Sequence, residues 1–385
     1  MRPRSYAIAN PPRPERAVLV GHAGRDGHDL PRSLEELRRL ADTAGARVLG
    51  TLVQRRGEVR PPTFIGKGKL AELKELAAET AADLAIFNDD LSPPQVRNLE
   101  KELGVKVVDR SELILDIFAR RARTRESRLQ VELAQLQYML PRLTGMWRHL
   151  ERQAGGIGTR GPGETQLETD RRFVREKIAR LKDALARVER ERATQRRRRQ
   201  ARFRAALVGY TNAGKSTLFN ALTRAGVFVE DRLFATLDAT TRQMVSPERH
   251  LALLTDTVGF IRKLPHHLVA SFHSTLVEAV EADLLLHVVD AADPDFRRQM
   301  EAVDGVLEEL LDGPRPTTTV FNKLDLVADE DFVAGLRAQY PGAFLVSART
   351  GEGLDLLRAH VWGQAAGHAA RGHARHAAAT TEETP

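Results

Sequence analysis

The chain has no cysteine among its 385 residues, so disulfide frameworks, thiolate metal sites and cysteine nucleophiles are excluded. No stretch approaches the roughly 18 uncharged apolar residues that a membrane-spanning helix needs. The N-terminal segment also lacks the apolar core of about 7–15 residues that marks a secretory signal. We therefore expect a soluble cytoplasmic protein without a transmembrane segment.

The composition that remains suits a folded chain of two or three domains. Hydrophobic residues make up 42% of the sequence and charged residues 29%, which is enough to build sizeable cores. Lys and Arg (59) outnumber Asp and Glu (52), so the formal net charge is +7. A surplus of this size does not by itself identify a nucleic-acid partner.

Residues 15–110 alternate between short apolar runs and helical patterns. We expect strands at residues 17–21, 47–54, 83–89 and 105–109, and helices at residues 33–45, 69–79 and 92–104. Ser33 and Ser92 are the expected N-caps of the first and third helices, and Pro93 suits a first helical turn. This alternation with short connections predicts a small parallel α/β domain.

The same segment contains the sequence Gly66-Lys-Gly-Lys69, which invites comparison with a phosphate-binding loop. It is too short for the full pattern and lacks the Ser or Thr that follows the lysine. We therefore favour a lysine-bearing turn before a helix over a second nucleotide site, and the sequence leaves open whether this domain binds ATP.

Residues 111–202 change character. Leu129, Leu133, Leu136 and Leu140 are spaced four-three-four, and a second stripe of the same kind runs through residues 174–188. Narrow heptad stripes on both sides of a Gly-rich run at 154–164 predict an antiparallel helical hairpin with a Gly-rich tip. Two unrelated surface helices are the alternative.

Arginines crowd both arms of this hairpin. There are eight Arg against three acids in residues 119–152 and nine Arg against two Glu in residues 187–204. Such runs often mean only a solvated helix. The tip, however, adds Trp147, His149 and Arg160, and guanidinium groups, backbone amides and aromatic planes are the surfaces that bind irregular RNA. Binding through phosphate contacts would be strongly salt-dependent.

From residue 203 to about 365, near-continuous apolar runs alternate with helices, as in parallel strands that are covered on both faces. The first run leads into residues 209–216, which fit G-x-x-x-x-G-K-[ST] before a predicted helix. The glycines allow backbone N–H groups to wrap phosphate oxygens. Lys215 would bridge the β- and γ-phosphates, and the Ser216 hydroxyl would bind Mg²⁺.

Two further motifs follow at strand ends. Asp256 can hold the Mg²⁺ shell, commonly through water, and the Gly259 amide is free to meet a γ-phosphate. Asp325, in the sequence Asn-Lys-Leu-Asp, can accept hydrogen bonds from N1 and N2 of guanine, a donor pair that adenine lacks. Asn322 would brace neighbouring loops, and a backbone amide near Ser347 can reach guanine O6. The predicted ligand is GTP.

A mobile segment between the phosphate loop and Asp256 should supply a threonine that senses the γ-phosphate. Thr236, Thr240 and Thr241 are the candidates, and their chemistry alone does not choose among them.

These elements closely resemble the HflX family of translational GTPases, over nearly the whole chain from Ala17 to Trp362. The resemblance rests on the stretches FIGKGK, LSPPQVRNLEKE, LILDIFARRART, LQVELAQL, ERQAGGIGTRGPGETQLETDRR, GYTNAGKSTLFN, FATLD and DTVGFIRKLPHHLV. It implies a GTPase that binds the large (50S) ribosomal subunit and acts in ribosome splitting, rescue of stalled ribosomes or ribosome biogenesis. It also implies that the hairpin tip faces ribosomal RNA and that Thr236 is the switch threonine.

The fold class that follows is α/β: a P-loop GTPase domain (203–365), preceded by the small parallel domain (15–110) and the helical hairpin (111–202). Residues 366–385 are expected to be a disordered tail. We expect a monomer away from the ribosome, with GTP or GDP, Mg²⁺ and rRNA as ligands.

The motifs and the resemblance together assign the site residues. Lys215, Thr236 and Gly259 are the catalytic candidates, and Ser216, Thr236 and Asp256 are the metal ligands. The GTP contacts are Gly209, Tyr210, Thr211, Asn212, Ala213, Gly214, Lys215, Ser216, Phe234, Ala235, Thr236, Leu237, Asp238, Asp256, Thr257, Val258, Gly259, Asn322, Lys323, Leu324, Asp325, Ser347, Ala348 and Arg349.

Phe260 stands where Ras-like GTPases have a glutamine that orients the attacking water. A phenyl ring can neither donate to nor accept from that water, so we expect slow intrinsic hydrolysis that a partner stimulates. His266 and His267 are better placed on a solvated face than as replacements. The alternative hypothesis is an RNA-binding or assembly module in which GTP fixes the conformation and turnover is incidental.

Overall fold

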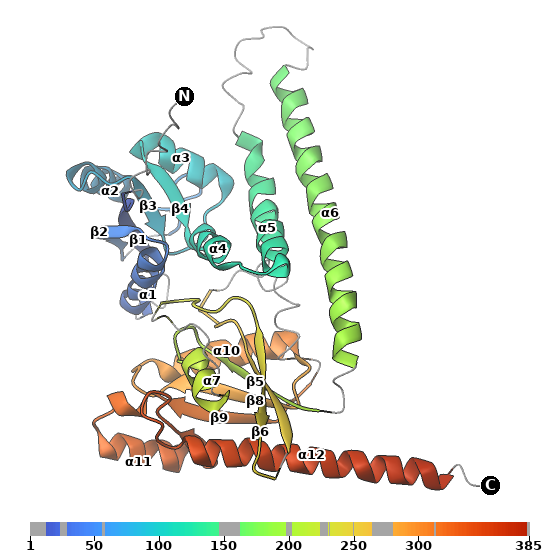
Figure 1. The fold of residues 1–385 in the computed structure, drawn as a ribbon. Coiled ribbons are helices and arrows are strands. Elements are labelled where there is room, and N and C mark those ends of the chain that lie inside the picture. The colour runs from blue at the N-terminus through green and yellow to red at the C-terminus, as the bar shows by residue number, and fades with distance from the viewer. Residues whose placement is uncertain are drawn as a thin grey trace, which may run out of the picture. The chain divides into compact units, whose positions relative to one another are not determined.

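The computed structural model describes residues 13–23, 29–55, 58–145, 162–197, 202–223, 230, 232–248, 250–263, 280–311 and 313–382 (Figure 1). The expected RNA-facing residues Trp147, His149 and Arg160, and also His266 and His267, lie outside these ranges. Among the helices that can be described, none has both the length and the apolar character needed to cross a membrane.

The chain divides into two compact units. One comprises Met1–Ile117 and Tyr138–Phe173, and the other comprises Phe118–Gln137 and Val174–Pro385. The first unit contains a parallel sheet in the order β2-β1-β3-β4. Its strands are β1 (Arg16–His22), β2 (Arg47–Gln54), β3 (Leu84–Phe87) and β4 (Lys106–Asp109), and they are connected by α1 (Leu30–Thr43), α2 (Lys67–Glu79) and α3 (Pro93–Leu103). The predicted small parallel α/β domain is confirmed.

The helix caps of this unit show one correct prediction and one wrong one. Ser92 forms a capping box with Gln95 at the start of α3, as its position before Pro93 predicts. Ser33 is not an N-cap, because α1 already begins at Leu30, with Pro31 in its first turn. The Ser33 hydroxyl donates instead to Oδ1 of Asn88, at 3.1 Å.

The second unit holds a six-stranded sheet in the order β10-β9-β8-β5-β7-β6. Its strands are β5 (Phe203–Gly209), β6 (Thr240–Val245), β7 (Leu251–Asp256), β8 (Leu284–Asp290), β9 (Thr317–Asn322) and β10 (Phe344–Leu345). All neighbours are parallel except β6, which runs antiparallel to β7 at one edge. The sequence pattern predicts the five parallel strands but misses β6, in which Met244 is the one buried residue.

Helices cover both faces of this sheet, as the apolar strands predict. On one face α7 (Lys215–Thr223) and α12 (Leu354–Glu382) contribute to a core that includes Leu218, Leu254 and Leu357. On the other face α10 (Phe296–Leu310) and α11 (Glu330–Gln339) contribute Phe296 and Leu336 to a core around Phe321. The sheet is therefore buried between two layers of helices, and its carboxyl edge is left for the connecting loops.

Two long helices follow α4 (Arg110–Arg121) along the chain. α5 (Arg125–Met139) and α6 (Pro162–Arg197) run side by side in opposite directions (Figure 1), and Nζ of Lys177 pairs with Oε1 of Glu132 at 2.6 Å. Leu133 and Leu181, one from each predicted heptad stripe, are buried. The geometry of the described part is that of the predicted antiparallel hairpin.

The end of the chain differs from its prediction. α12 continues to Glu382, whereas the sequence predicts disorder from residue 366. The segment is rich in alanine, which has the highest helix propensity of all residues, and it extends a helix that the core already nucleates.

Candidate nucleotide-binding site

The phosphate loop connects β5 to α7 and contains three residues with positive φ: Gly209 (150°), Asn212 (63°) and Gly214 (87°). A Cβ at Gly209 would lie 2.2 Å from the backbone oxygen of Val288, and one at Gly214 would lie 2.3 Å from Nδ2 of Asn322. Both positions therefore require glycine. Curled loops of this kind bind anions through successive N–H groups.

Lys215 is the first residue of α7 and is only 6% exposed. Its Nζ donates to the backbone oxygens of Gly209 (3.1 Å) and Tyr210 (2.8 Å), so the ammonium group is folded onto the loop. Burial lowers the pKa of Lys215 to about 8, and the nearby Asp256 carboxylate opposes that shift. A bound phosphate would supply the negative charge that this buried cation favours.

Ser216, Thr236 and Asp256 meet beside the loop. The Ser216 hydroxyl donates to Oδ2 of Asp256 at 2.6 Å, and its oxygen lies 2.7 Å from Oγ1 of Thr236. Asp256 is completely buried, and its Oδ1 makes no hydrogen bond. Burial raises the pKa of Asp256, while the Ser216 hydrogen bond and the Lys215 charge act in the opposite direction. The corner offers two hydroxyl oxygens and an unsatisfied carboxylate oxygen.

The structure also separates the three candidate switch threonines. Thr240 begins the edge strand β6, and Oγ1 of Thr241 lies 2.9 Å from Oγ1 of Thr255 across the β6–β7 pair. Thr236 is the candidate whose hydroxyl reaches Ser216. The geometry therefore favours Thr236 at the phosphate end of the site.

The segment after β7 is bound directly to the phosphate loop. Phe260 donates its backbone N–H to the oxygen of Gly209 (3.1 Å) and accepts a hydrogen bond from the N–H of Thr211 (2.6 Å). A Cβ at Gly259 would lie 2.6 Å from Cα of Thr211 and 2.9 Å from Nζ of Lys215. The Phe260 side chain itself is 1% exposed, so its ring packs in the interior.

A pocket opens between these segments. It is lined by Thr211, Asn212, Gly214, Lys215, Ser216, Thr217, Glu230, Arg232, Phe234, Ala235, Thr236, Thr257 and Gly259. Thr217, Glu230 and Arg232 were not predicted as site residues. Thr217 adjoins the phosphate-loop motif, but Glu230 and Arg232 carry no motif that reveals their position.

The guanine motif is assembled around Asn322 at the end of β9. Its Nδ2 donates to the backbone oxygen of Ala213 (3.0 Å), and its Oδ1 accepts from the N–H of Ala348 (3.0 Å). Asn322 therefore braces two loops, as predicted from its type and position. Oδ1 of Asp325 accepts from the Ser347 hydroxyl at 2.6 Å, which fixes the carboxylate next to the second of these loops.

Lys323 is held by a residue that the sequence reasoning missed. It has a positive φ of 65°, and its Nζ pairs with Oδ2 of Asp290 at 2.7 Å. Asp290 is the last residue of β8, and its position at the carboxyl end of an apolar strand is the signal by which it could have been found. Arg349 lies at the rim, 80% exposed and 3.8 Å from Asp325.

Several predicted contacts do not present their side chains to the pocket. Leu237, Val258 and Leu324 are buried. Thr257 lines the pocket, but its hydroxyl donates to the backbone oxygen of Leu207. The Tyr210 hydroxyl accepts from the N–H of Arg262. The Asp238 carboxylate accepts hydrogen bonds from Arg123 and Thr124 at the start of α5.

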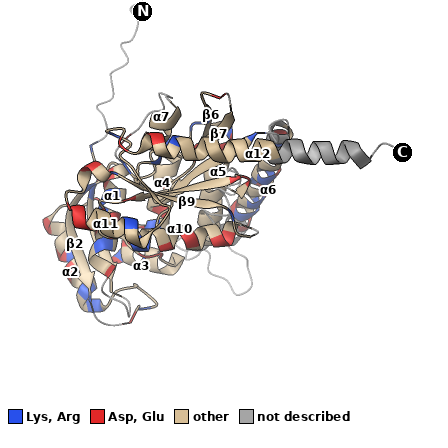
Figure 2. Cartoon of the chain, turned by 90° about the horizontal axis from the view of Figure 1, so that it is seen from below, with Lys and Arg blue, Asp and Glu red and all other residues tan. Residues whose placement is uncertain are grey.

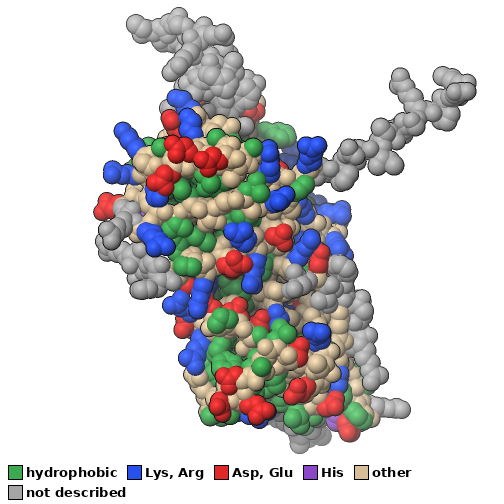
Figure 3. Space-filling view, turned by 90° about the vertical axis from the view of Figure 1, so that its left-hand side faces the viewer, with side chains coloured by type: hydrophobic (Ala, Val, Ile, Leu, Met, Phe, Trp, Pro, Cys, Tyr) green, Lys and Arg blue, Asp and Glu red, His purple; other side chains and the backbone are tan. Residues whose placement is uncertain are grey.

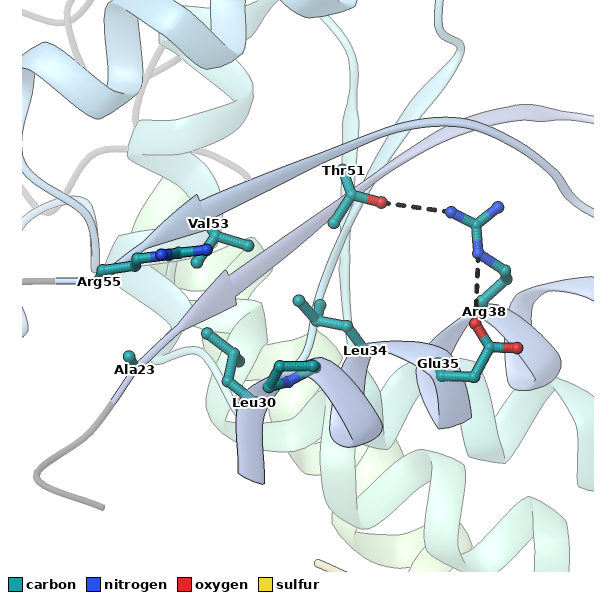
Figure 4. A pocket seen from close by; sticks show the side chains of 9 residues that line it. Ala23, Leu30, Leu34, Glu35, Arg38, Thr51, Val53 and Arg55 are labelled. Atoms are coloured by element: carbon teal, nitrogen blue, oxygen red, sulfur yellow. Dashed lines mark hydrogen bonds and ion pairs between the residues drawn. The ribbon is translucent and has the colours of Figure 1, made fainter. Parts of the chain in front are cut away.

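A second pocket lies in the first unit, beside β1, β2 and α1 (Figure 4). Its floor is apolar, with Leu30, Leu34 and Val53, and the Arg38 guanidinium at its edge interacts with Glu35 and with the Thr51 hydroxyl. The Gly66 turn does not line this pocket. Gly66 instead precedes α2 and donates its N–H to Gln54, as expected of a turn before a helix.

Three family descriptions match consecutive parts of the chain. They are the GTP-binding GTPase N-terminal region (residues 31–119), the GTP-binding GTPase middle region (121–199) and the 50S ribosome-binding GTPase (204–323).

Similar proteins are named GTPase HflX. The one from Escherichia coli is 48% identical over 349 residues, covering 89% of this chain and 81% of the relative. The one from Caldanaerobacter subterraneus is 53% identical over 315 residues, covering 81% and 73%. Among solved structures, the complex of SsGBP with GDP has a TM-score of 0.51 at 25% identity and covers 92% of this chain and 99% of that chain.

Proposed function

The chain belongs to the HflX family of GTPases, and from this premise we propose that it is a nucleotide-dependent switch that binds the large ribosomal subunit. In this proposal it acts in splitting or rescuing ribosomes or in their biogenesis, in the cytoplasm. The observation that carries the proposal is geometric: the phosphate loop, Asp256 with its partner Ser216, and the loops held by Asn322 meet at the carboxyl edge of one sheet. Most of this segment matches the 50S ribosome-binding GTPase family.

Within the site, Lys215 holds the β- and γ-phosphates and the Gly259 amide meets the γ-phosphate. The phosphates replace the two backbone oxygens that Lys215 now contacts, and this exchange gives the buried cation a full anionic partner. Asp325, already oriented by Ser347, accepts from the guanine edge. The Lys323 stem, fixed at its head by Asp290, lies over the base.

The Asp256 corner fits Mg²⁺, because hard divalent cations prefer oxygen ligands and Oδ1 of Asp256 is buried without a hydrogen bond. Ser216 and Thr236 would hold the ion through their hydroxyls, and Asp256 would hold it through water. When bound, Mg²⁺ neutralises charge on the phosphates.

Intrinsic hydrolysis is slow in this proposal. Phe260 cannot orient water, and its ring is directed into the interior, so the described part of the chain offers no substitute at that position. A partner then supplies positioning or charge, and the ribosome is the partner that we propose.

The hairpin supplies the RNA-binding surface. The Phe173 ring on α6 is 64% exposed in a sequence that carries Arg171, Arg172 and Arg175. Such a ring between guanidinium groups is suited to stacking on unpaired bases.

Sedimentation with purified ribosomal subunits tests the proposal. We expect the protein to pellet with large subunits in GTP or a non-hydrolysable analogue and to be released in GDP. Single-turnover hydrolysis should be faster with large subunits than without them. Equal pelleting in all nucleotide states, together with equal rates, would contradict the switch.

The alternative of a binding module is distinguished by variants. Lys215→Ala weakens the binding of every nucleotide, whereas Gly259→Ala introduces a Cβ 2.9 Å from Nζ of Lys215 and impairs the triphosphate state in particular. If Gly259→Ala hydrolysed GTP more slowly but still bound and left ribosomes with the nucleotide dependence of the natural chain, turnover would be incidental.

A further inference from the structure

The switch segment of the GTPase domain is attached at three points to residues just before α5. Phe234 meets the Phe118 ring edge-to-face, with centroids 4.7 Å apart, and both rings are fully buried. Glu230 forms an ion pair with Arg121. All of these residues belong to the second unit, so the attachment is part of one compact body.

The third attachment is the most directional. Oδ2 of Asp238 accepts hydrogen bonds from the N–H groups of Arg123 (3.1 Å) and Thr124 (3.3 Å), and its Oδ1 accepts from the Thr124 hydroxyl at 2.6 Å. Thr124 in turn caps α5, because its Oγ1 accepts from the N–H of Ser127 at 3.1 Å. A carboxylate at this place is stabilised by the free N–H groups and the positive end of the helix.

Asp238 is only two residues from Thr236. The Thr236 hydroxyl lies 2.7 Å from the Ser216 hydroxyl, which in turn donates to Asp256. Two residues of backbone leave Thr236 little freedom once Asp238 and the buried Phe234 are both fixed. Asp238 thus anchors one side of Thr236, and Phe234 anchors the other.

We propose that Asp238 is a positioning residue for GTP hydrolysis: by binding the first turn of α5 it holds Thr236 against Ser216 at the phosphate end of the site. Its carboxylate is bound by Arg123 and Thr124, and Asp238 does not line the nucleotide pocket. The coupling is reciprocal, because any movement of the start of α5 also moves Thr236. The helical hairpin that begins with α5 is therefore connected mechanically to the γ-phosphate sensor.

Two single variants and their combination test the proposal. Asp238→Ala removes the carboxylate, and Thr124→Ala removes the hydroxyl that holds it. We expect each to lower the single-turnover rate of GTP hydrolysis about tenfold, the size of one lost charge-assisted hydrogen bond. The double variant should be no slower than the slower single variant, because both lesions open the same contact. Thr124→Ser keeps the hydroxyl and should retain the natural rate.

The GDP affinity and the thermal midpoint of Asp238→Ala separate a positioning role from a general structural role. Both values should stay close to those of the matched control Asp329→Ala, which removes an aspartate cap from α11 in the same unit. The proposal would be overturned if the two single losses of hydrolysis rate added in the double variant, or if Asp238→Ala hydrolysed GTP at the natural rate. It would also be overturned if the affinity of Asp238→Ala for GDP fell as much as its hydrolysis rate. Should Asp238→Ala fail to fold, Thr124→Ala paired with Thr124→Ser gives the same test.

Discussion

Lys215 and Asp256 are ionisable side chains that the fold shields almost completely from solvent. Burial lowers the pKa of Lys215 to about 8 and raises the pKa of Asp256, so each residue is less stable in its charged form than it would be in water. The polyphosphate of a nucleotide would raise the pKa of Lys215 again, since it places anionic oxygens next to the ammonium group. The site is therefore strained electrostatically until its ligand binds.

A measurable consequence is proton uptake. At about pH 9, above the Lys215 pKa of about 8, the free protein holds this amine largely neutral. Bound GTP raises the pKa again, so binding should take up close to one proton. At about pH 6.5 the amine is protonated in both states, and uptake should vanish. Calorimetry in buffers of different ionisation enthalpy measures this directly. An enthalpy that is independent of the buffer at the higher pH would refute the assignment.

Single residues also show where sequence reasoning stops. Glycine and lysine of the phosphate loop are recognisable because the chemistry of phosphate binding fixes their spacing. The chemistry of Thr236, Thr240 and Thr241 does not choose among them. The family resemblance indicates Thr236, and the pairing of β6 with β7, which no local pattern reveals, supports that choice. Asp238 was predicted to contact the nucleotide, but its partners are more than 110 positions away in the sequence.

Glycine at position 209 has a steric cause that a stability measurement can test. A Cβ there would lie 2.2 Å from the backbone oxygen of Val288 at a φ of 150°. We expect Gly209→Ala to lower the free energy of unfolding by about 3 kcal/mol. Gly305→Ala, in the open middle of α10, has no atom within 4 Å of its new Cβ and should gain about 0.5–1 kcal/mol. Chemical denaturation compares the two, and equal effects would refute the steric account.

At the scale of elements, the periodicity of apolar residues predicts the parallel strands of both units and the three helices of the first sheet correctly. It fails where a strand buries a single residue, as β6 buries Met244, and where a helix begins one turn before its apparent cap, as α1 does before Ser33. The periodicity of apolar residues does not predict which loops contact one another. Asn322 on β9 joins the phosphate loop to the loop after β10, and only its type and its place in a motif indicate this.

Removing that connection should affect all nucleotides alike. Asn322→Ala leaves the backbone oxygen of Ala213 and the N–H of Ala348 without their partner. Because neither contact involves the γ-phosphate, we expect GTP and GDP affinity to fall equally, by about thirtyfold for roughly 2 kcal/mol of lost hydrogen bonding. Asn98→Ala, which removes a hydrogen bond to Pro62 in the other unit, is the control. A loss confined to GTP would show that Asn322 acts elsewhere.

The whole molecule carries an excess of only seven positive charges, and Figure 3 shows Lys and Arg mixed with Asp and Glu over the face that it presents. The basic character is uneven along the chain. α6 alone has eleven Lys and Arg against seven Asp and Glu, and its cations are drawn blue in Figure 2. A local basic helix on a nearly balanced protein favours binding at one surface over diffuse attraction to any polyanion.

The salt dependence of ribosome binding distinguishes contact through α6 from diffuse attraction of the whole protein to RNA. If α6 contacts ribosomal RNA phosphates, the affinity for large subunits should fall steeply as salt rises, and replacing the exposed Arg172, Arg175 and Arg180 by Ala should lower the slope of log K against log salt by about 2–3. The control replaces three exposed arginines of the GTPase domain, Arg297, Arg315 and Arg337, and keeps the same net charge as the first variant. Both variants change the overall field equally, so only a direct contact predicts a difference between them. Equal slopes in the two variants would remove α6 from the interface and leave the hairpin as a mechanical element alone.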